Sequence, residues 1–84
     1  MQTLHEIKEF IVAEFVPGGK PEDIPDNLDL VQTGVIDSLG VLNLIAALED
    51  EVGIRVQPED MNAETFSTVV KIHGFISDRV GAGG

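Results

Sequence analysis

A chain of 84 residues is long enough to bury one small core and too short for an enclosed multi-residue enzyme cleft. Its 5 basic and 15 acidic residues give a formal net charge of −10, which argues against nucleic acid as a direct partner because phosphate neutralisation requires a Lys/Arg surface. The hydrophobic content of 43% predicts a folded globule, and the absence of cysteine excludes disulfides and thiolate metal sites.

Targeting and metal signals are also missing from the sequence. No N-terminal run resembles a signal peptide, and no apolar stretch reaches the length that spans a bilayer. Asp23, Asp26 and Asp29 lack the spacing of a calcium loop, so no metal site is predicted. We therefore expect a cytoplasmic monomer without membrane insertion, whose acidic surface steers it toward basic patches on other proteins.

The first helix is predicted over residues 4–15. Thr3 and Glu6 have the spacing of a capping box, with Thr at the N-cap and Glu at N3. Apolar residues at i, i+3, i+7 and i+11 then form one stripe, and Pro17-Gly18-Gly19 ends the helix. The stripe consists of Leu4, Ile7, Ile11 and Phe15.

Residues 16–37 are predicted to form a long structured loop, because three prolines interrupt any helix there. Apolar residues recur through the segment, so the loop should pack onto the core. A loop of this length in a small domain is commonly functional. Its apolar residues are Leu28, Leu30, Val31 and Ile36.

A second helix is predicted from Ser38 to about Val52, with Gly53 at C′. It is apolar around most of its circumference, unlike a helix that packs on one side only. One stripe belongs to the core; the other either lies under the long loop or forms an exposed docking patch, and we favour docking. The core stripe is Val41, Leu44, Ile45, Leu48 and Val52, and the second stripe is Leu39, Leu42 and Ala46, bordered by Glu49, Asp50 and Glu51.

The rest of the chain predicts one short helix within residues 55–66 and a last helix over about 68–80. The buried stripe of that last helix should be Val69, Ile72, Ile76 and Val80. We predict an all-α fold, a small four-helix bundle of three longer helices and one short helix, over residues 1–80. Residues 81–84 should be a flexible tail.

Asp37-Ser38-Leu39 lies where the loop gives way to the second helix. A serine that opens a helix has its hydroxyl beside unpaired backbone N–H groups and the positive end of the macrodipole. A phosphate ester on that oxygen would be tolerated there. The alternative is an ordinary N-cap, because serine is among the best N-capping residues. Asp37 has its own plain interpretation as an acid favourable to the dipole, worth ~0.3–1 kcal/mol.

The wider pattern resembles the family of acyl and peptidyl carrier proteins. It comprises Gly34-x-x-Asp37-Ser38-Leu39, an apolar helix ending in Glu49-Asp50-Glu51, then Gly53-Ile54-x-Val56 and Pro58-Glu59-Asp60. The resemblance implies that Ser38, flanked by Asp37 and Leu39, carries a 4′-phosphopantetheine arm whose thiol holds an acyl or aminoacyl group as a thioester. The implied partners are a phosphopantetheinyl transferase, an acyl- or aminoacyl-loading ligase or transferase, and downstream pathway enzymes. Asp37 would then also assist magnesium-dependent attachment or attract the transferase.

The chain departs from the pattern of fatty-acid carriers just after the serine, where Gly40 and Asn43 replace expected acids. It looks more like discrete carriers of specialised (polyketide or nonribosomal peptide) or cell-envelope metabolism. The expected docking residues are Leu39, Leu42, Asn43, Ala46, Glu49 and Asp50.

Two other functions compete with the carrier. An acidic helical adaptor without a covalent cofactor would leave Ser38 dispensable. An enzyme has little support, since His5 and His73 are far apart in sequence and no nucleophile arrangement can be assembled.

Overall fold

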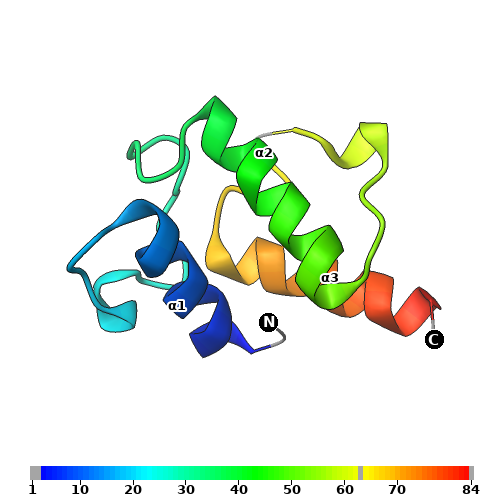
Figure 1. The fold of residues 1–84 in the computed structure, drawn as a ribbon, viewed down its shortest axis with the longest axis horizontal. Coiled ribbons are helices and arrows are strands. Elements are labelled where there is room, and N and C mark those ends of the chain that lie inside the picture. The colour runs from blue at the N-terminus through cyan, green and yellow to red at the C-terminus, as the bar shows by residue number, and fades with distance from the viewer. Residues whose placement is uncertain (1–2, 63, 84) are drawn as a thin grey trace.

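The computed structural model describes residues 3–62 and 64–83, with side chains up to residue 80 (Figure 1). Three α-helices and shorter helical turns follow one another, and the described residues form no strand, so the all-α prediction is confirmed. The elements are α1 (Leu4–Phe15), η1 (Pro21–Asp23), α2 (Ser38–Ala47), η2 (Leu48–Val52), η3 (Pro58–Asp60) and α3 (Val69–Gly83).

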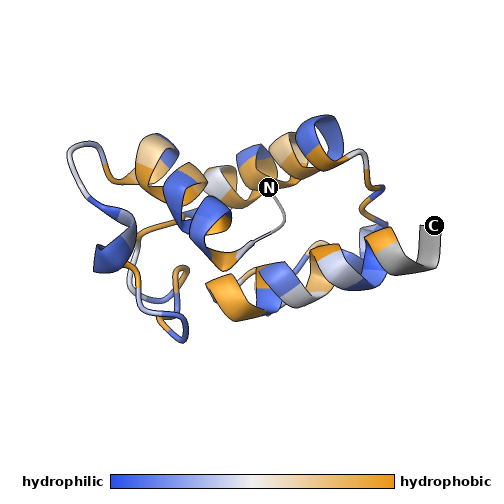
Figure 2. Ribbon diagram, turned by 90° about the horizontal axis from the view of Figure 1, so that it is seen from below, coloured by the Kyte–Doolittle hydropathy of each residue, from blue (hydrophilic) through white to orange (hydrophobic). Residues whose placement is uncertain are grey.

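Helix α1 has the predicted bounds and the predicted cap. Glu6 N–H donates to Thr3 Oγ1, and Thr3 N–H donates to Glu6 Oε1, each at 3.1 Å. Ile7 and Ile11 are fully buried, and α1 packs against α3. Helices α1 and α3 carry hydrophobic and hydrophilic residues on different sides (Figure 2), whereas α2 buries Leu44 and Ile45 on one side and exposes Leu39 and Leu42 on another. The core is therefore built from one side of each helix.

Between α1 and α2 the chain forms the 3₁₀ helix η1 and a series of turns that cross the core. Leu30 and Ile36 are fully buried, and Leu28 packs partly against the core. Leu30 N–H donates to the Ser67 carbonyl at 2.6 Å, which ties this segment to the residues that precede α3. Val31, which was expected in the core, is half-buried outside it.

Helix α2 continues into the π-helical segment η2, so the helical run ends at Val52 as predicted. Gly53 follows with φ of 80°, the left-handed conformation that favours glycine after a helix. Leu44, Ile45 and Leu48 are buried in the core. The other two residues of the predicted core stripe, Val41 and Val52, are half-buried against it.

The short helix expected within residues 55–66 is only the three-residue 3₁₀ turn η3. A capping bond begins this turn, since Gln57 N–H donates to Asp60 Oδ2 at 3.1 Å. Beyond it, side-chain bonds replace helical ones: Asn62 Nδ2 donates to the Glu59 carbonyl at 3.2 Å, and Thr65 N–H donates to Asn62 Oδ1 at 2.9 Å. Such bonds offer the backbone an alternative to helix, which is why the turn does not continue.

An ion pair fixes η3 to α3. Arg79 donates to Asp60 Oδ2 at 2.6 Å, and both side chains are largely buried, at 29% and 15% exposed. The Arg79 guanidinium also lies 4.7 Å from the centre of the Phe75 ring, which packs edge-on against Phe66. Charge and aromatic contacts therefore hold the segment between η2 and α3 in place.

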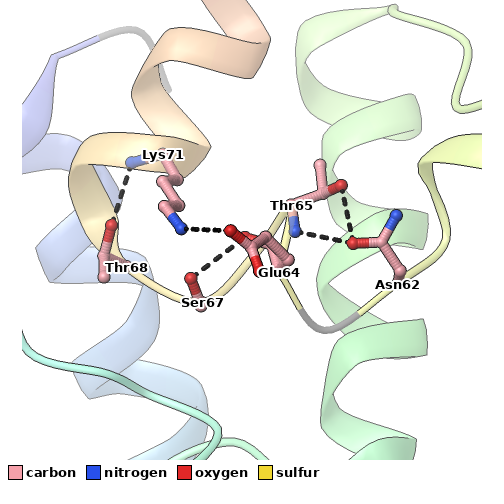
Figure 3. A network of polar contacts seen from close by, with 6 residues as sticks. All are labelled: Asn62, Glu64, Thr65, Ser67, Thr68 and Lys71. Atoms are coloured by element: carbon pink, nitrogen blue, oxygen red, sulfur yellow. Dashed lines mark hydrogen bonds and ion pairs between the residues drawn. The ribbon is translucent and has the colours of Figure 1, made fainter.

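Helix α3 starts one residue after its predicted start, and the Thr68 hydroxyl accepts from Lys71 N–H at 3.1 Å (Figure 3). Val69, Ile72 and Ile76 are buried as predicted. Val80 is 40% exposed, so its assignment to the buried stripe was wrong: the core ends one turn earlier.

The backbone of α3 extends to Gly83, beyond the predicted end near Val80. The flexible tail over residues 81–84 stays a prediction, and Gly84 lies outside the described residues. No helix within the described ranges combines the length and the apolarity needed to cross a membrane.

Candidate functional site

Asp37, not Ser38, caps α2. Its backbone is extended, with φ of −91° and ψ of −174°, and its carboxylate Oδ1 accepts from Gly40 N–H at 2.7 Å. The interpretation of Ser38 as an ordinary N-cap is therefore wrong. Aspartate caps helices as well as serine does, so in Asp37-Ser38 the first of the two takes the cap and the second becomes the first helical residue.

Ser38 presents a free hydroxyl at the positive end of α2. The residue is exposed, and its side chain forms no hydrogen bond with any described part of the chain. The first backbone N–H groups of a helix have no intrahelical partner. In α2 the Gly40 N–H is bound by the Asp37 carboxylate, which leaves those of Ser38 and Leu39 beside this position. An anionic ester on Ser38 Oγ would lie beside these donors and the macrodipole, while the hydroxyl stays accessible from solvent.

The approach to Ser38 is held in place by the core. Ile36 is fully buried, and its N–H donates to the Leu30 carbonyl at 2.9 Å. Two residues earlier, Gly34 has φ of 82° and turns the chain with a conformation that disfavours side chains. The chain therefore enters α2 at a fixed place, because the buried Ile36, two residues before the exposed Ser38, is hydrogen-bonded to the buried Leu30.

The second apolar stripe of α2 is exposed to solvent. Leu39 is 70% exposed and Leu42 is 55% exposed, the largest values among the exposed bulky apolar side chains of the described residues. Ala46 and Asn43 are exposed as well. The alternative that the long loop covers this stripe is therefore wrong. The surface beginning at Ser38 is apolar rather than charged.

The acidic end of the helical run contains two different kinds of carboxylate. Glu49 Oε2 accepts from Val56 N–H at 3.0 Å, across the turn at Gly53, so this expected docking residue has an internal partner. The Asp50 side chain is exposed and has no partner among the described residues. At 1.5 Å per residue, Glu49 and Asp50 lie about 16–18 Å along the helix from Ser38, so the structure does not bring the two parts of the predicted site together.

The histidines do not join this site. His5 lies in α1 and faces Glu9 at 3.5 Å, and His73 lies half-buried in α3. Within the described ranges, no group of three or more His, Cys, Asp or Glu side chains is arranged to hold a metal ion.

Gly40 is a site residue that the sequence interpretation missed. It was read only as the loss of an expected acid, yet it is buried and donates the capping hydrogen bond to Asp37. The available signal was a glycine in the first turn of an otherwise apolar helix, because glycine disfavours helix and its presence there points to a close contact.

Comparison with known proteins agrees with this geometry. Residues 12–75 match the family described as "Phosphopantetheine attachment site". The chain is 31% identical over 67 residues to the 4-methyl-3-hydroxyanthranilic acid carrier protein of Streptomyces anulatus, covering 80% of this chain and 81% of that protein. It is 38% identical over 53 residues to the D-alanyl carrier protein of Streptococcus sanguinis, covering 61% and 67% of the two chains.

Among solved structures, the chain is similar to KstB-PCP in its apo form. The TM-score is 0.69 at 39% identity, covering 98% of this chain and 87% of that one.

Proposed function

The chain belongs to the phosphopantetheine attachment-site family of carrier proteins, and from that premise we propose that Ser38 is the residue that carries the arm. As a carrier protein, the chain tethers an intermediate as a thioester on covalent 4′-phosphopantetheine. The attachment at Ser38 is supported above all by one observation: its hydroxyl is exposed, makes no hydrogen bond to the described residues, and lies in the first turn of α2.

Attachment requires a displacement at phosphorus. Ser38 Oγ attacks the pantetheine-side phosphorus of coenzyme A, the pyrophosphate P–O bond breaks, and adenosine 3′,5′-bisphosphate leaves. The hydroxyl proton goes to a base of the transferase. The product is a phosphodiester anion, which the macrodipole of α2 and its free first-turn N–H groups stabilise. No internal hydrogen bond of the Ser38 hydroxyl has to be broken for the ester to form.

We infer that partner enzymes dock on the exposed stripe that starts beside Ser38. Leu39, Leu42 and Ala46 supply the apolar contacts, Asn43 lies between them, and Asp50 supplies charge. The partners are the phosphopantetheinyl transferase, a ligase or transferase that loads the acyl or aminoacyl group, and downstream enzymes. Glu49 contributes less to docking than expected, because its carboxylate already accepts from Val56 N–H.

We propose that η3 takes the place of the short helix in the carrier family's four-helix arrangement. We place the domain at residues 1–80, with no catalytic residue of its own, acting as a cytoplasmic monomer. The relatives carry an aromatic acid and D-alanine by name, which supports specialised or cell-envelope metabolism over fatty-acid synthesis. Mass spectrometry of the cargo-loaded chain from its host tests this assignment: a fatty acyl group on Ser38 would contradict it.

Counting thiols tests the attachment directly, because the chain has no cysteine. Treatment with a broad-specificity phosphopantetheinyl transferase and coenzyme A should raise the thiol content of the denatured protein from zero to one per chain. Peptide mapping should locate the arm at Ser38. Loading with an acyl group should remove the thiol signal, and hydroxylamine should restore it.

Ser38→Ala is the matched control. It should stay at zero thiols while its free energy of unfolding changes by less than about 0.5 kcal/mol, since the hydroxyl it removes has no described partner. A wild-type chain that remains without a thiol, while a control carrier is modified, would favour the acidic adaptor instead.

A further inference from the structure

The first turn of α2 leaves no room for a side chain at position 40. A Cβ built on Gly40 would lie 2.9 Å from Ile36 Cγ2, 2.9 Å from Phe15 Cε1 and 3.2 Å from Asp37 Oδ1. Gly74, in α3, would place a Cβ with nothing within 4 Å. Gly40 and Gly74 therefore differ: a Cβ at position 40 would collide with its neighbours, whereas a Cβ at position 74 would lie in open space.

Each of the three neighbours of Gly40 has other contacts of its own. Ile36 is fully buried and its backbone is tied to Leu30. Phe15 is the last residue of α1 and packs its ring partly against the core. The Asp37 atom that a Cβ at position 40 would approach, Oδ1, already accepts from Gly40 N–H. An added methyl group would therefore collide with Ile36 before α2, with Phe15 at the end of α1 and with the capping Asp37.

We infer that Gly40 is a positioning residue for the modification of Ser38, an inference that rests on the proposed attachment at that serine. Its missing side chain lets the start of α2 lie directly against Phe15 and Ile36, while its N–H holds the Asp37 carboxylate. These contacts fix the first turn, and with it the direction in which the Ser38 hydroxyl leaves the helix. Gly40 itself is buried and does not need to contact the transferase.

The same packing explains the missing acid after the serine. A glutamate or aspartate at position 40 would have to displace Phe15 or Ile36 before its carboxylate reached solvent. The neighbourhood of Ser38 is therefore kept free of an added carboxylate by the fit between α1 and α2, and enzymes that approach Ser38 meet the exposed Leu39 instead.

The test compares Gly40→Ala with Gly74→Ala in arm attachment by the transferase and coenzyme A, at a temperature where thermal unfolding shows both variants fully folded. We expect kcat/KM to fall by about 10- to 100-fold for Gly40→Ala, since a misplacement of ~1 Å near reacting atoms can cost ~10²-fold. Gly74→Ala should react at the wild-type rate. The amide of residue 40 should also lose hydrogen-exchange protection, because the cap at Asp37 is disturbed.

Rescue separates positioning from a general loss of stability. Phe15→Leu removes the ring atom Cε1, so Gly40→Ala combined with Phe15→Leu should recover part of the lost rate relative to Phe15→Leu alone. This pair also keeps the test decisive if Gly40→Ala alone fails to fold. Attachment to a folded Gly40→Ala at the wild-type rate would overturn the inference. An unmodified wild-type chain would instead overturn the attachment at Ser38.

Discussion

The two ends of the α2–η2 run are each held by a hydrogen bond from a backbone N–H to a carboxylate, but they present different side chains to solvent. At each end one carboxylate accepts from a backbone N–H: Asp37 from Gly40 at the start and Glu49 from Val56 near the finish. Beyond these bonds, the start presents Leu39 and Leu42, whereas the finish presents acids. The comparison teaches that charge count alone misjudges a docking surface, since an acid that holds the fold is less available to a partner.

The largest effects should come from the two leucines that lie two residues apart on α2. Leu44→Ala removes a fully buried side chain and should lower the free energy of unfolding by about 2–5 kcal/mol. Leu42→Arg should change it by less than about 0.5 kcal/mol, because Leu42 is 55% exposed, yet it should slow loading and delivery. Chemical denaturation and acyl-transfer assays on the holo protein measure the two effects. If Leu42→Arg instead unfolds the domain, Leu42 belongs to the core and its assignment to the docking surface is wrong.

A smaller difference should separate the neighbouring acids at the far end. Glu49→Ala leaves the N–H of the buried Val56 without its acceptor and should destabilise the domain by about 1 kcal/mol. Asp50→Ala should leave stability unchanged within about 0.5 kcal/mol and slow transfer from the loading enzyme at low salt only. Equal stability of the two variants in urea titrations would mean that the hydrogen bond from Val56 N–H to Glu49 does not stabilise the domain.

The smallest change in stability should appear in Asp37→Asn. Asp37→Ala removes the cap of α2 and should cost about 1 kcal/mol, whereas Asp37→Asn keeps an acceptor of similar capping strength and should stay within a few tenths. Asparagine removes the negative charge beside Ser38, so arm attachment to Asp37→Asn should be slower than to wild type. Attachment at the wild-type rate would restrict Asp37 to its capping role.

Local signals in the sequence predicted the helices well. The capping box at Thr3 and Glu6, the helical run that starts at Ser38, and Gly53 as C′ all follow from chemistry within a few residues, and all three are confirmed. The exposed second stripe followed from a simple excess of apolar residues on one short helix. The family assignment followed from the motif and its flanks together.

What the sequence did not predict depends on contacts between distant residues. Gly40 lies against Phe15, which is 25 positions away by their numbering, and no local pattern reports that approach. The Glu49–Val56 bond crosses a turn, and the buried stripe of α3 ends before Val80 because the core ends there. The short helix shrank to η3 because side-chain hydrogen bonds competed with its backbone.

The fit between Gly40 and Phe15 carries a consequence for how such chains diverge. Because a Cβ at position 40 would lie 2.9 Å from both the Phe15 ring and the Ile36 side chain, a larger residue there requires both neighbours to shift. Substitutions at positions 15, 36 and 40 are therefore coupled to one another. A chain that keeps this fit has no side chain at position 40, so the carboxylate that flanks Ser38 in the first turn of α2 is that of the capping Asp37.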